Sequence, residues 1–506
     1  MSVSFARGLS AASIFAISTS TGWADVSPQE VWSDWKSYLT GMGYDISAQE
    51  SQSGGVLTVS DLSLGMQVPD AEGVVTMTMP QLVFTDNGDG SVNVTLPAEF
   101  PMLMSMRPDG EESVDIELNY AHADAVMTVS GDPDDMTSDY SASTASIALK
   151  SLNVDGEAVP ASVGNFAMTM NNVASSTQTI VAEGRSYAQN MSADSLTYQL
   201  GFKDPDSDDQ ASFNGTLNQI GFQGTAAVPA DANPNDVRAM LDAGFSFDGT
   251  FSYGQATTSM SGAGDGETFG FEGQTQDGAV GVAMSATHLS YDVQQKATSM
   301  SISSGELPFP IMLSMSGFGF NMSMPIAKSD AEQDFAFGIS LTEFTVPDML
   351  WGMVDPAAIM PRDPATIVVD LSGKAKMLFD LMDPESAAEM GDQPPGELNA
   401  LTVNDLQVAA AGAKIAGTGD FTFDNTDLQS FDGMPAPSGV ANLSISGANG
   451  LIDRLIQMGF LAEEDAMGAR MMMGMLAVPG ETPDTLTSKI EINDQGHIIA
   501  NGQRIK

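Results

Sequence analysis

Three histidines, His122, His288 and His497, are the only imidazoles with which this chain could perform acid–base chemistry. A hydrolase needs a nucleophile with a base beside it, but these histidines lie far apart, on segments whose patterns predict strands or a hairpin. The sequence contains no Gly-x-Ser-x-Gly motif and no pair of histidines at the helical spacing of a zinc site. It also contains no cysteine, which excludes thiolate chemistry and disulfides. We therefore expect no catalytic residue, no metal site and no cofactor.

Acidic turns are the remaining candidates for cation chemistry. Residues 86–90 (DNGDG) resemble part of a calcium loop, but they lack its twelve-residue length and terminal bidentate Glu, so they predict a hairpin turn. The acidic cluster at residues 132–135 (DPDD) could bind Ca²⁺ through its carboxylates or could be a solvated loop, and the sequence leaves both open. An acid-dependent hydrolase needs two carboxylates, and among 66 acidic residues no pair stands out.

The charge balance restricts the partners. The chain has 18 Lys and Arg against 66 Asp and Glu, a formal net charge of −48, and its basic residues are dispersed. Nucleic acids and anionic headgroups are held by clustered basic residues, so we expect no nucleic-acid partner. Because 42% of the residues are hydrophobic, the chain can nevertheless bury a core.

The N-terminus predicts export. Arg7, a mild apolar run at residues 9–17 and the sequence Gly22-Trp23-Ala24 are together typical of a secretory signal peptide that is cleaved after Ala24. The run is too short to span a bilayer, and no later stretch reaches the roughly 18 apolar residues of a membrane helix. An exported chain without cysteine fits the periplasm of a Gram-negative bacterium. We therefore expect a periplasmic protein without a transmembrane span.

Helix and strand patterns alternate along the rest of the chain. Residues 27–30 (SPQE) form a capping box with Pro at the first helical position, which predicts a helix that Gly41 and Gly43 end. From residue 54 the period changes to two, and turn residues separate the runs. Helical patterns return in mid-chain at residues 347–360, which contain Asp355-Pro356, a cap followed by a first-turn Pro, and residues 383–385 (DPE) predict the start of another helix. Near the C-terminus they predict a helical pair at residues 450–459 and 463–476.

These patterns predict a mainly β protein, a long coiled antiparallel sheet or meander with a few short helices at the N-terminus, in mid-chain and near the C-terminus. We divide the chain into a signal peptide (1–24), an N-terminal helix (25–50), an antiparallel β region (51–346), a helical and turn insertion that contains a strand (347–395), and a second β region with a helical pair and a C-terminal hairpin (396–506).

Two unusual motifs lie in the second half of the chain. The first joins residues 351–356 (WGMVDP) to residues 361–364 (PRDP), and the second joins residues 490–493 (IEIN) to Gly496 and residues 501–504 (NGQR). With these motifs and a Gly-Asp-Gly hairpin at residues 88–90, nearly the whole mature chain resembles the bacterial exported family called domain of unknown function 2125. The resemblance implies no activity, ligand or catalytic residue. The family-motif positions, whose role it leaves open, are Trp351, Asp355, Pro356, Arg362, Asp363, Pro364, Asn501 and Gly502.

The expected architecture also has a weak similarity to AsmA-like envelope proteins, which hold lipid in a β-groove. Arg362 stands out because basic residues are rare here. It could bind an anionic headgroup, or it could form a salt bridge that fixes the turn at residues 361–364, and we favour the salt bridge.

One face of the expected strands is rich in Met and Phe. Between residues 311 and 324 the alternation changes parity at Ser316-Gly317, which predicts a β-bulge. The 34 Met residues supply pliable apolar surface. Such side chains could pack a closed core, as in most amphipathic strands, or form a groove for an apolar ligand. The candidate apolar-ligand face consists of Phe245, Phe247, Phe318, Phe320, Met322, Met324, Phe335, Phe337, Ile339 and Leu341.

Three interpretations of function follow. The leading one is a non-catalytic envelope protein that binds a lipid or another apolar partner on this face through the burial of hydrocarbon. The alternative is a structural or protein-interaction module with a closed β core. The third is an acid-dependent hydrolase of an envelope polymer. The sequence leaves open the ligand and the oligomeric state.

Overall fold

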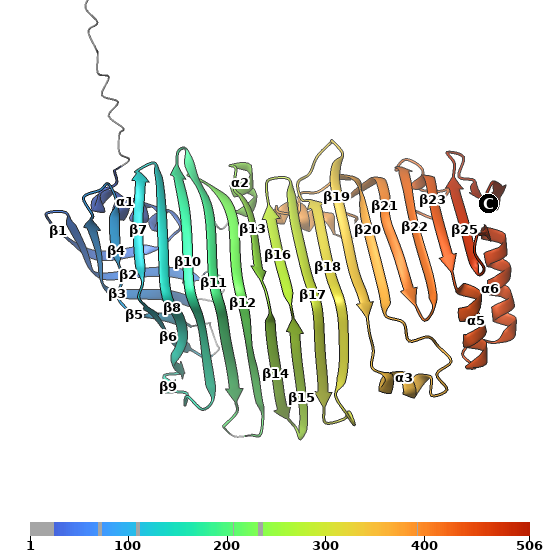
Figure 1. Cartoon of the computed structure of the whole chain (residues 1–506). Helices are drawn as coiled ribbons and strands as arrows, with labels where there is room; N and C mark the ends of the chain where they lie inside the picture. Colours follow the sequence, from blue (N-terminus) through green and yellow to red (C-terminus); the bar gives the residue numbers. More distant parts are fainter. Residues whose placement is uncertain (1–24, 69–72, 108–111, 206, 231–235, 392) are drawn as a thin grey trace, which may run out of the picture.

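The computed structural model describes residues 25–68, 73–107, 112–205, 207–230, 236–391 and 393–506 (Figure 1). The predicted signal peptide, residues 1–24, lies outside these residues. Strands account for 62% of the described residues and helices for 12%. The prediction of a mainly β fold with one large antiparallel sheet is therefore confirmed.

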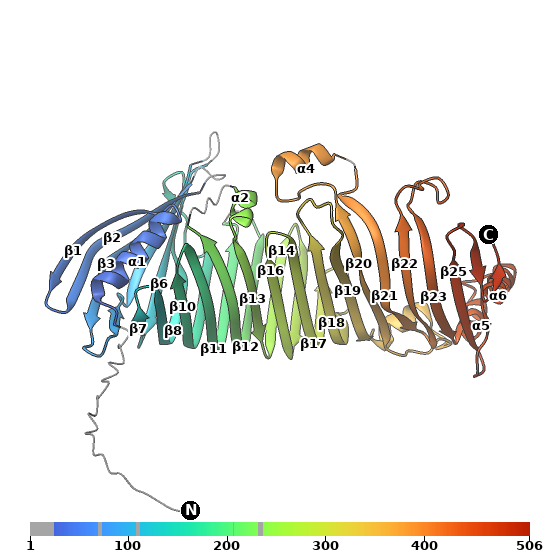
Figure 2. The same cartoon turned by 90° about the horizontal axis from the view of Figure 1, so that it is seen from above.

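All 27 strands in the described part of the chain belong to one antiparallel sheet. The long strands pair with the strands before and after them in sequence, so the sheet is a meander that runs the length of the molecule (Figures 1 and 2). Neighbouring antiparallel strands need only short turns between them, which the Gly- and Asp-rich segments supply. The sheet is open, because its first and last strands lie at opposite ends of the molecule.

The strands of the first half are β1 (Asp45–Ser53), β2 (Val56–Val68), β3 (Gly73–Asp86), β4 (Val92–Thr95), β5 (Glu99–Met106), β6 (Val114–Ala123), β7 (Val126–Asp132), β8 (Asp135–Val154), β9 (Glu157–Ala158), β10 (Gly164–Val181), β11 (Gly184–Lys203) and β12 (Gln210–Pro229). Those of the centre are β13 (Ser246–Tyr253), β14 (Ala256–Gly264), β15 (Glu267–Thr275), β16 (Asp277–Met284), β17 (His288–Ser304), β18 (Ile311–Pro325), β19 (Gln333–Phe344) and β20 (Ala365–Met377).

The strands of the C-terminal part are β21 (Gly396–Ala410), β22 (Ala413–Asp424), β23 (Ala436–Ser446), β24 (Val478–Pro479), β25 (Thr485–Ile492), β26 (Ile498–Ala500) and β27 (Gln503–Arg504). The helices are α1 (Pro28–Gly41), α2 (Val237–Asp242), α3 (Asp348–Val354), α4 (Pro384–Met390), α5 (Ala448–Gln457) and α6 (Glu463–Leu476). Strands β19, β20 and β21 pair in order, so the expected boundaries at residues 347 and 396 fall within one continuous sheet.

Helix α1 begins and ends where the sequence predicts. The Ser27 hydroxyl accepts a hydrogen bond from the Glu30 N–H at 3.3 Å, and the Ser27 N–H donates to Glu30 Oε2 at 2.9 Å, which completes the capping box. The ring of Trp32 is buried and lies 6.0 Å from that of Phe84 on β3, measured between centroids. Helix α1 therefore covers one face of the first strands.

The other helices agree with the sequence in part. Asp383 caps α4, and the pair α5 and α6 lies close to the predicted ranges. The predicted helical segment at residues 347–360 is confirmed in its first half by α3, but the cap assigned to Asp355 is wrong. Helix α3 ends at Val354, and a left-handed residue, Ala358 at φ +49°, prevents a helix from following. Among the described residues, no helix combines the length and the apolar character that crossing a membrane requires.

A line of irregular residues, here called the bulge line, crosses the sheet from β6 to β19. Its residues either interrupt the register within a strand or connect two successive strands. They are Asp124, Ser143, Asn172, Asp194, Gln219, Gly254, Gln255, Gln276, Ala297, Ser316 and Glu343. Five of them have positive φ, between +47° and +54°, on roughly every second strand. At this line the alternation of side chains between the two faces shifts by one residue, as the parity change at Ser316-Gly317 predicts. Apolar side chains on both sides of the line therefore point to the same face of the sheet.

Buried apolar clusters are confined to the N-terminal half of the described residues. The larger cluster joins α1 to the strands from β1 to β8, and a smaller one around Val173, Ala193 and Ile220 lies beside the bulge line. The accessible surface of the chain is 29211 Å² for 52.9 kDa, whereas a compact monomer of this mass exposes roughly 17,700 Å². Most of the sheet is therefore not wrapped around a core.

Candidate functional site

One row of opposed side chains crosses twelve strands and is apolar at eleven positions. Residues that lie directly opposite in an antiparallel pair share a face of the sheet, so this row defines the apolar face. At a strand spacing of about 4.8 Å, its eleven steps span about 53 Å. The row consists of Met127, Tyr140, Ser175, Met191, Phe222, Phe251, Val280, Val293, Phe320, Ile339, Val369 and Leu406.

The apolar face is uncovered from β11 to β22. Twelve large side chains on it are 37% to 54% exposed, whereas core side chains under α1, such as Phe84 at 0%, are shielded. A soluble monomer seldom leaves so large an apolar surface in water, and such surfaces mark binding sites. The exposed members are Leu200, Phe202, Phe213, Met260, Phe269, Val280, Tyr291, Phe337, Ile339, Ile367, Val408 and Ile415.

Aromatic rings lie flat on this face because glycines sit beside them. A Phe247 ring carbon lies 2.6 Å from the point that a Cβ of Gly249 would occupy, and the Tyr253 ring lies 2.2 Å from the corresponding point of Gly278. Any larger residue at these glycines would lift the ring. The aromatic rings therefore lie along the sheet instead of projecting from it, and the surface is smooth and rich in hydrocarbon.

The structure brings together nine of the ten residues that the sequence assigned to the candidate face. They lie on the apolar face of β13, β18 and β19: Phe247, Phe318, Phe320, Met322, Met324, Phe335, Phe337, Ile339 and Leu341. Phe318 is opposite Leu341, and Met322 is opposite Phe337. Phe245 lies just before β13, after α2. Ligand binding by these residues stays a prediction.

Helix α1 borders one end of the uncovered surface. Its Tyr38 ring meets the Tyr187 ring of β11 at a centroid distance of 5.8 Å, and its Asp34 forms an ion pair with Arg185 on the same strand. Burial raises the pKa of Tyr187 to about 12. The phenol therefore remains neutral at physiological pH, which suits its position at an apolar edge.

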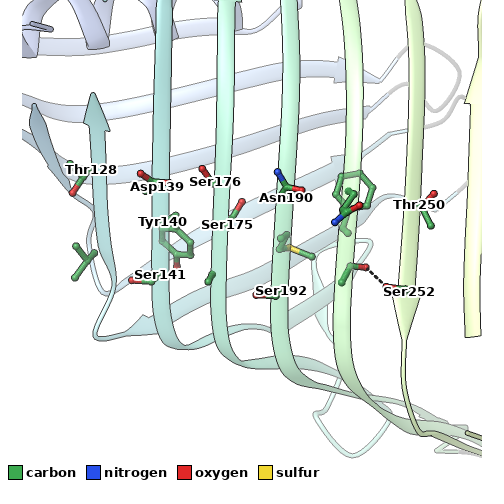
Figure 3. A pocket seen from close by; sticks show the side chains of 16 residues that line it. Thr128, Asp139, Tyr140, Ser141, Ser175, Ser176, Asn190, Ser192, Thr250 and Ser252 are labelled. Carbon is green, nitrogen blue, oxygen red and sulfur yellow. Dashed lines mark hydrogen bonds between the residues drawn. The ribbon is translucent and has the colours of Figure 1, made fainter. Parts of the chain in front are cut away.

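The opposite face of the sheet is polar and holds a cavity of about 770 Å³ (Figure 3). Hydroxyl and amide side chains from β7 to β13 line it in two rows, which include Thr128, Ser176, Asn190 and Ser252. Asp139 is the single acidic residue of the lining, which also includes Tyr140. This arrangement provides no pair of acids for hydrolysis and is the solvent-facing side of amphipathic strands.

The acidic turns are stabilised by their own backbone. Asp86 Oδ1 accepts a hydrogen bond from the Gly88 N–H at 2.7 Å, so the predicted hairpin turn at residues 86–90 is confirmed. Asp132 and Asp135 face each other at the β7–β8 turn. Throughout the part of the chain that the structure describes, no three acidic or histidine side chains gather as metal ligands would.

Asp355 and Arg362, two of the family-motif positions, stabilise the connection between α3 and β20. Asp355 is 1% exposed, and its carboxylate accepts hydrogen bonds from the N–H groups of Ile359 at 2.9 Å and Met360 at 2.7 Å, which lower its pKa. Arg362 Nη1 lies 2.6 Å from Asp348 Oδ1, so the favoured salt bridge is present.

The remaining motif positions lie nearby or at the C-terminus. Trp351 is in α3, and Pro356, Asp363 and Pro364 lie on the way to β20. Asn501 and Gly502 form the β26–β27 turn with positive φ, and Asn501 Nδ2 donates a hydrogen bond to the Leu476 carbonyl at 2.9 Å. These contacts are structural.

The histidines do not converge. His122 is in β6, His288 begins β17 and His497 precedes β26, at separate places along the sheet. His288 Nε2 lies 3.0 Å from the Asp334 carbonyl oxygen, and its Nδ1 lies 3.0 Å from Thr287 Oγ1. The Thr287 hydroxyl is the one potential nucleophile in these contacts, and no carboxylate in them orients the imidazole as a general base.

Sequence reasoning missed a small group of polar side chains on the apolar face. The Tyr253 ring crosses Gly278 and its hydroxyl accepts a hydrogen bond from Gln295 Nε2 at 3.2 Å. Beside the bulge line, Thr275 Oγ1 and Thr298 Oγ1 are 3.3 Å apart and both side chains are buried. The available signal was Gln295 itself, a polar residue that continues the apolar alternation of β17 at 289, 291 and 293.

Comparison with known proteins identifies a family. The model of the family described as "Uncharacterized protein conserved in bacteria (DUF2125)" matches residues 232–497, which is 266 of the 506 residues. No curated protein and no solved structure matches the chain. The matched residues include most of the uncovered apolar face, from β13 to β22.

Proposed function

The chain belongs to the DUF2125 family of bacterial proteins, and we propose that it is an exported envelope protein that binds the hydrocarbon of lipids on the apolar face of its sheet. Binding requires no covalent step. The proposal of export and of a periplasmic location is supported by the signal-peptide pattern of residues 1–24.

The observation that carries this proposal is the set of large apolar side chains that stay 37% to 54% exposed on one face, from β11 to β22. Removing such surface from water gains about 25 cal/mol per Å². The apolar row spans about 53 Å, whereas one leaflet of a bilayer holds hydrocarbon of about 15 Å, half of a core about 30 Å thick. The face therefore has room for more than one acyl chain.

Charge and burial distinguish this proposal from the other interpretations. A net charge of −48 opposes docking on an anionic membrane surface, whereas a neutral hydrocarbon chain carries no such penalty. The exposed fractions argue against a module with a closed β core.

The hydrolase interpretation lacks a suitable acid. A general acid needs a raised pKa, but every carboxyl group of the described residues with a resolved shift has a lowered one. Asp115 illustrates this, because hydrogen bonds from Ser105 and Arg107 lower its pKa.

The test is native mass spectrometry of the full chain, expressed in a Gram-negative bacterium and purified from the periplasm without detergent. Solvent extraction and lipid identification follow, with polypeptide mass as the check on cleavage after Ala24. We expect co-purifying lipid, at more than one acyl chain per polypeptide. A bare polypeptide that takes up no lipid from neutral phosphatidylcholine vesicles would refute the binding proposal, and an uncleaved cytoplasmic chain would refute export.

A further inference from the structure

Four neutral polar side chains interrupt the apolar face near its centre. Tyr253, Gln295, Thr275 and Thr298, here called the polar node, come from β13, β15 and β17. Tyr253, Gly278, Gln295 and Phe318 lie opposite one another across four strands. The threonine pair follows on the other side of the bulge line, opposite Ala256 and Met315.

The node retains hydrogen-bond donors. The Tyr253 hydroxyl accepts from Gln295 Nε2, so its own hydrogen is free, and the Gln295 amide has a second N–H. Neither donor has an acceptor in the contacts of the described residues. Tyr253 and Gln295 are partly exposed, while Thr275 and Thr298 are 8% and 7% exposed and bond to each other. The two accessible donors thus belong to Tyr253 and Gln295, whereas the buried threonine hydroxyls share one hydrogen bond with each other.

Placement of such donors in an apolar surface is costly unless an acceptor meets them. The matching acceptor is neutral, because the nearest cation along the chain, Lys296, is on the opposite face and bonds to Asp277 at 3.2 Å. A carboxylate or phosphate would find no compensating charge at the node.

We propose that the polar node binds the carbonyl oxygen of an acyl ester or amide, while the attached hydrocarbon lies along the apolar face on either side. This inference rests on the proposed function and specifies its ligand class. The face then selects lipids at their acyl linkage rather than at their headgroup, and it discriminates against plain hydrocarbon.

The test is a competition between two probes of similar chain length, methyl palmitate and octadecane. The full chain is equilibrated with a dispersion that contains equal amounts of both, recovered, and extracted, and the bound ester-to-alkane ratio is measured. The variants are Tyr253→Phe, which keeps the ring over Gly278, and Gln295→Leu. The matched control is Tyr44→Phe, which removes a hydroxyl beside the cluster under α1, outside the uncovered apolar face.

We expect each node variant to lower the ester-to-alkane ratio roughly two- to tenfold, the effect of one hydrogen bond, with the total bound hydrocarbon unchanged. Tyr44→Phe should keep the wild-type ratio. Unchanged ratios in both node variants would overturn the inference and leave the proposed function standing. A wild-type protein that retains neither probe would overturn both.

Discussion

The substitution Phe337→Thr separates an open binding face from a core. Phe337 is 37% exposed, and a phenylalanine side chain has about 200 Å² to bury, so about 75 Å² remains for a ligand. At about 25 cal/mol per Å², its loss weakens ligand binding by about 1.9 kcal/mol, or about 25-fold in Kd. The cost to folding is larger by the same accounting, because about 125 Å² of the side chain is already buried in the fold, which is worth about 3 kcal/mol, and the edge-to-face contact with Phe320 is lost as well.

The assay is a fluorescence titration with N-phenyl-1-naphthylamine, a neutral apolar dye, together with urea unfolding. Met312→Thr is the matched control, because Met312 is 65% exposed but lies on the polar face of β18. We expect weaker dye binding for Phe337→Thr and none of that loss for Met312→Thr. Equal losses in the two variants, or a folded Phe337→Thr variant that binds the dye as tightly as the wild type, would refute the reasoning.

Further substitutions test how the sheet is stabilised, each by urea unfolding. Gly373→Ala should destabilise the fold by about 1–3 kcal/mol, because the added carbon would lie 2.2 Å from the Ala400 carbonyl oxygen. Gly474→Ala in α6, with open space around it, should stabilise the fold by about 0.5–1 kcal/mol. A change of the same sign in both variants would contradict the account. Asp355→Asn should destabilise at pH 7. Because the pKa of Asp355 is lowered in the fold, its carboxylate stabilises the protein fully at pH values above the ordinary Asp pKa of about 3.9. This advantage over Asn should vanish as the pH falls through the pKa that Asp355 has in the fold. A difference in stability that does not depend on pH would contradict this. Asp484→Ala should cost about 1 kcal/mol, because it removes the acceptor of the Gly450 N–H at the start of α5; an unchanged midpoint would count against that cap.

Local signals in the sequence predicted much of the fold. The capping box fixed the start of α1, and the period of two with intervening Gly and Asp turns predicted an antiparallel meander. These features depend on residues close in sequence. The helix cap predicted at Asp355 failed because the carboxylate instead accepts backbone hydrogen bonds from Ile359 and Met360.

The candidate face was predictable in composition but not in exposure. Alternation places Phe320 and Phe337 on one side of their strands, yet it does not tell whether a second layer covers them. The parity change at Ser316 was visible in one strand, whereas its alignment with Ala297 and Glu343 depends on strand register. The polar node was missed for the same reason, since Tyr253 and Gln295 are neighbours only in the folded sheet.

The most direct test of the central claim is to ask which face of the sheet touches lipid in the cell. The photoreactive residue p-benzoylphenylalanine is introduced at Phe337 on the apolar face or at Met312 on the polar face, cells are irradiated, and lipid adducts of the purified protein are measured by mass spectrometry. The account predicts acyl-lipid adducts at position 337 and not at position 312. Adducts at both positions alike, or only at position 312, would contradict it.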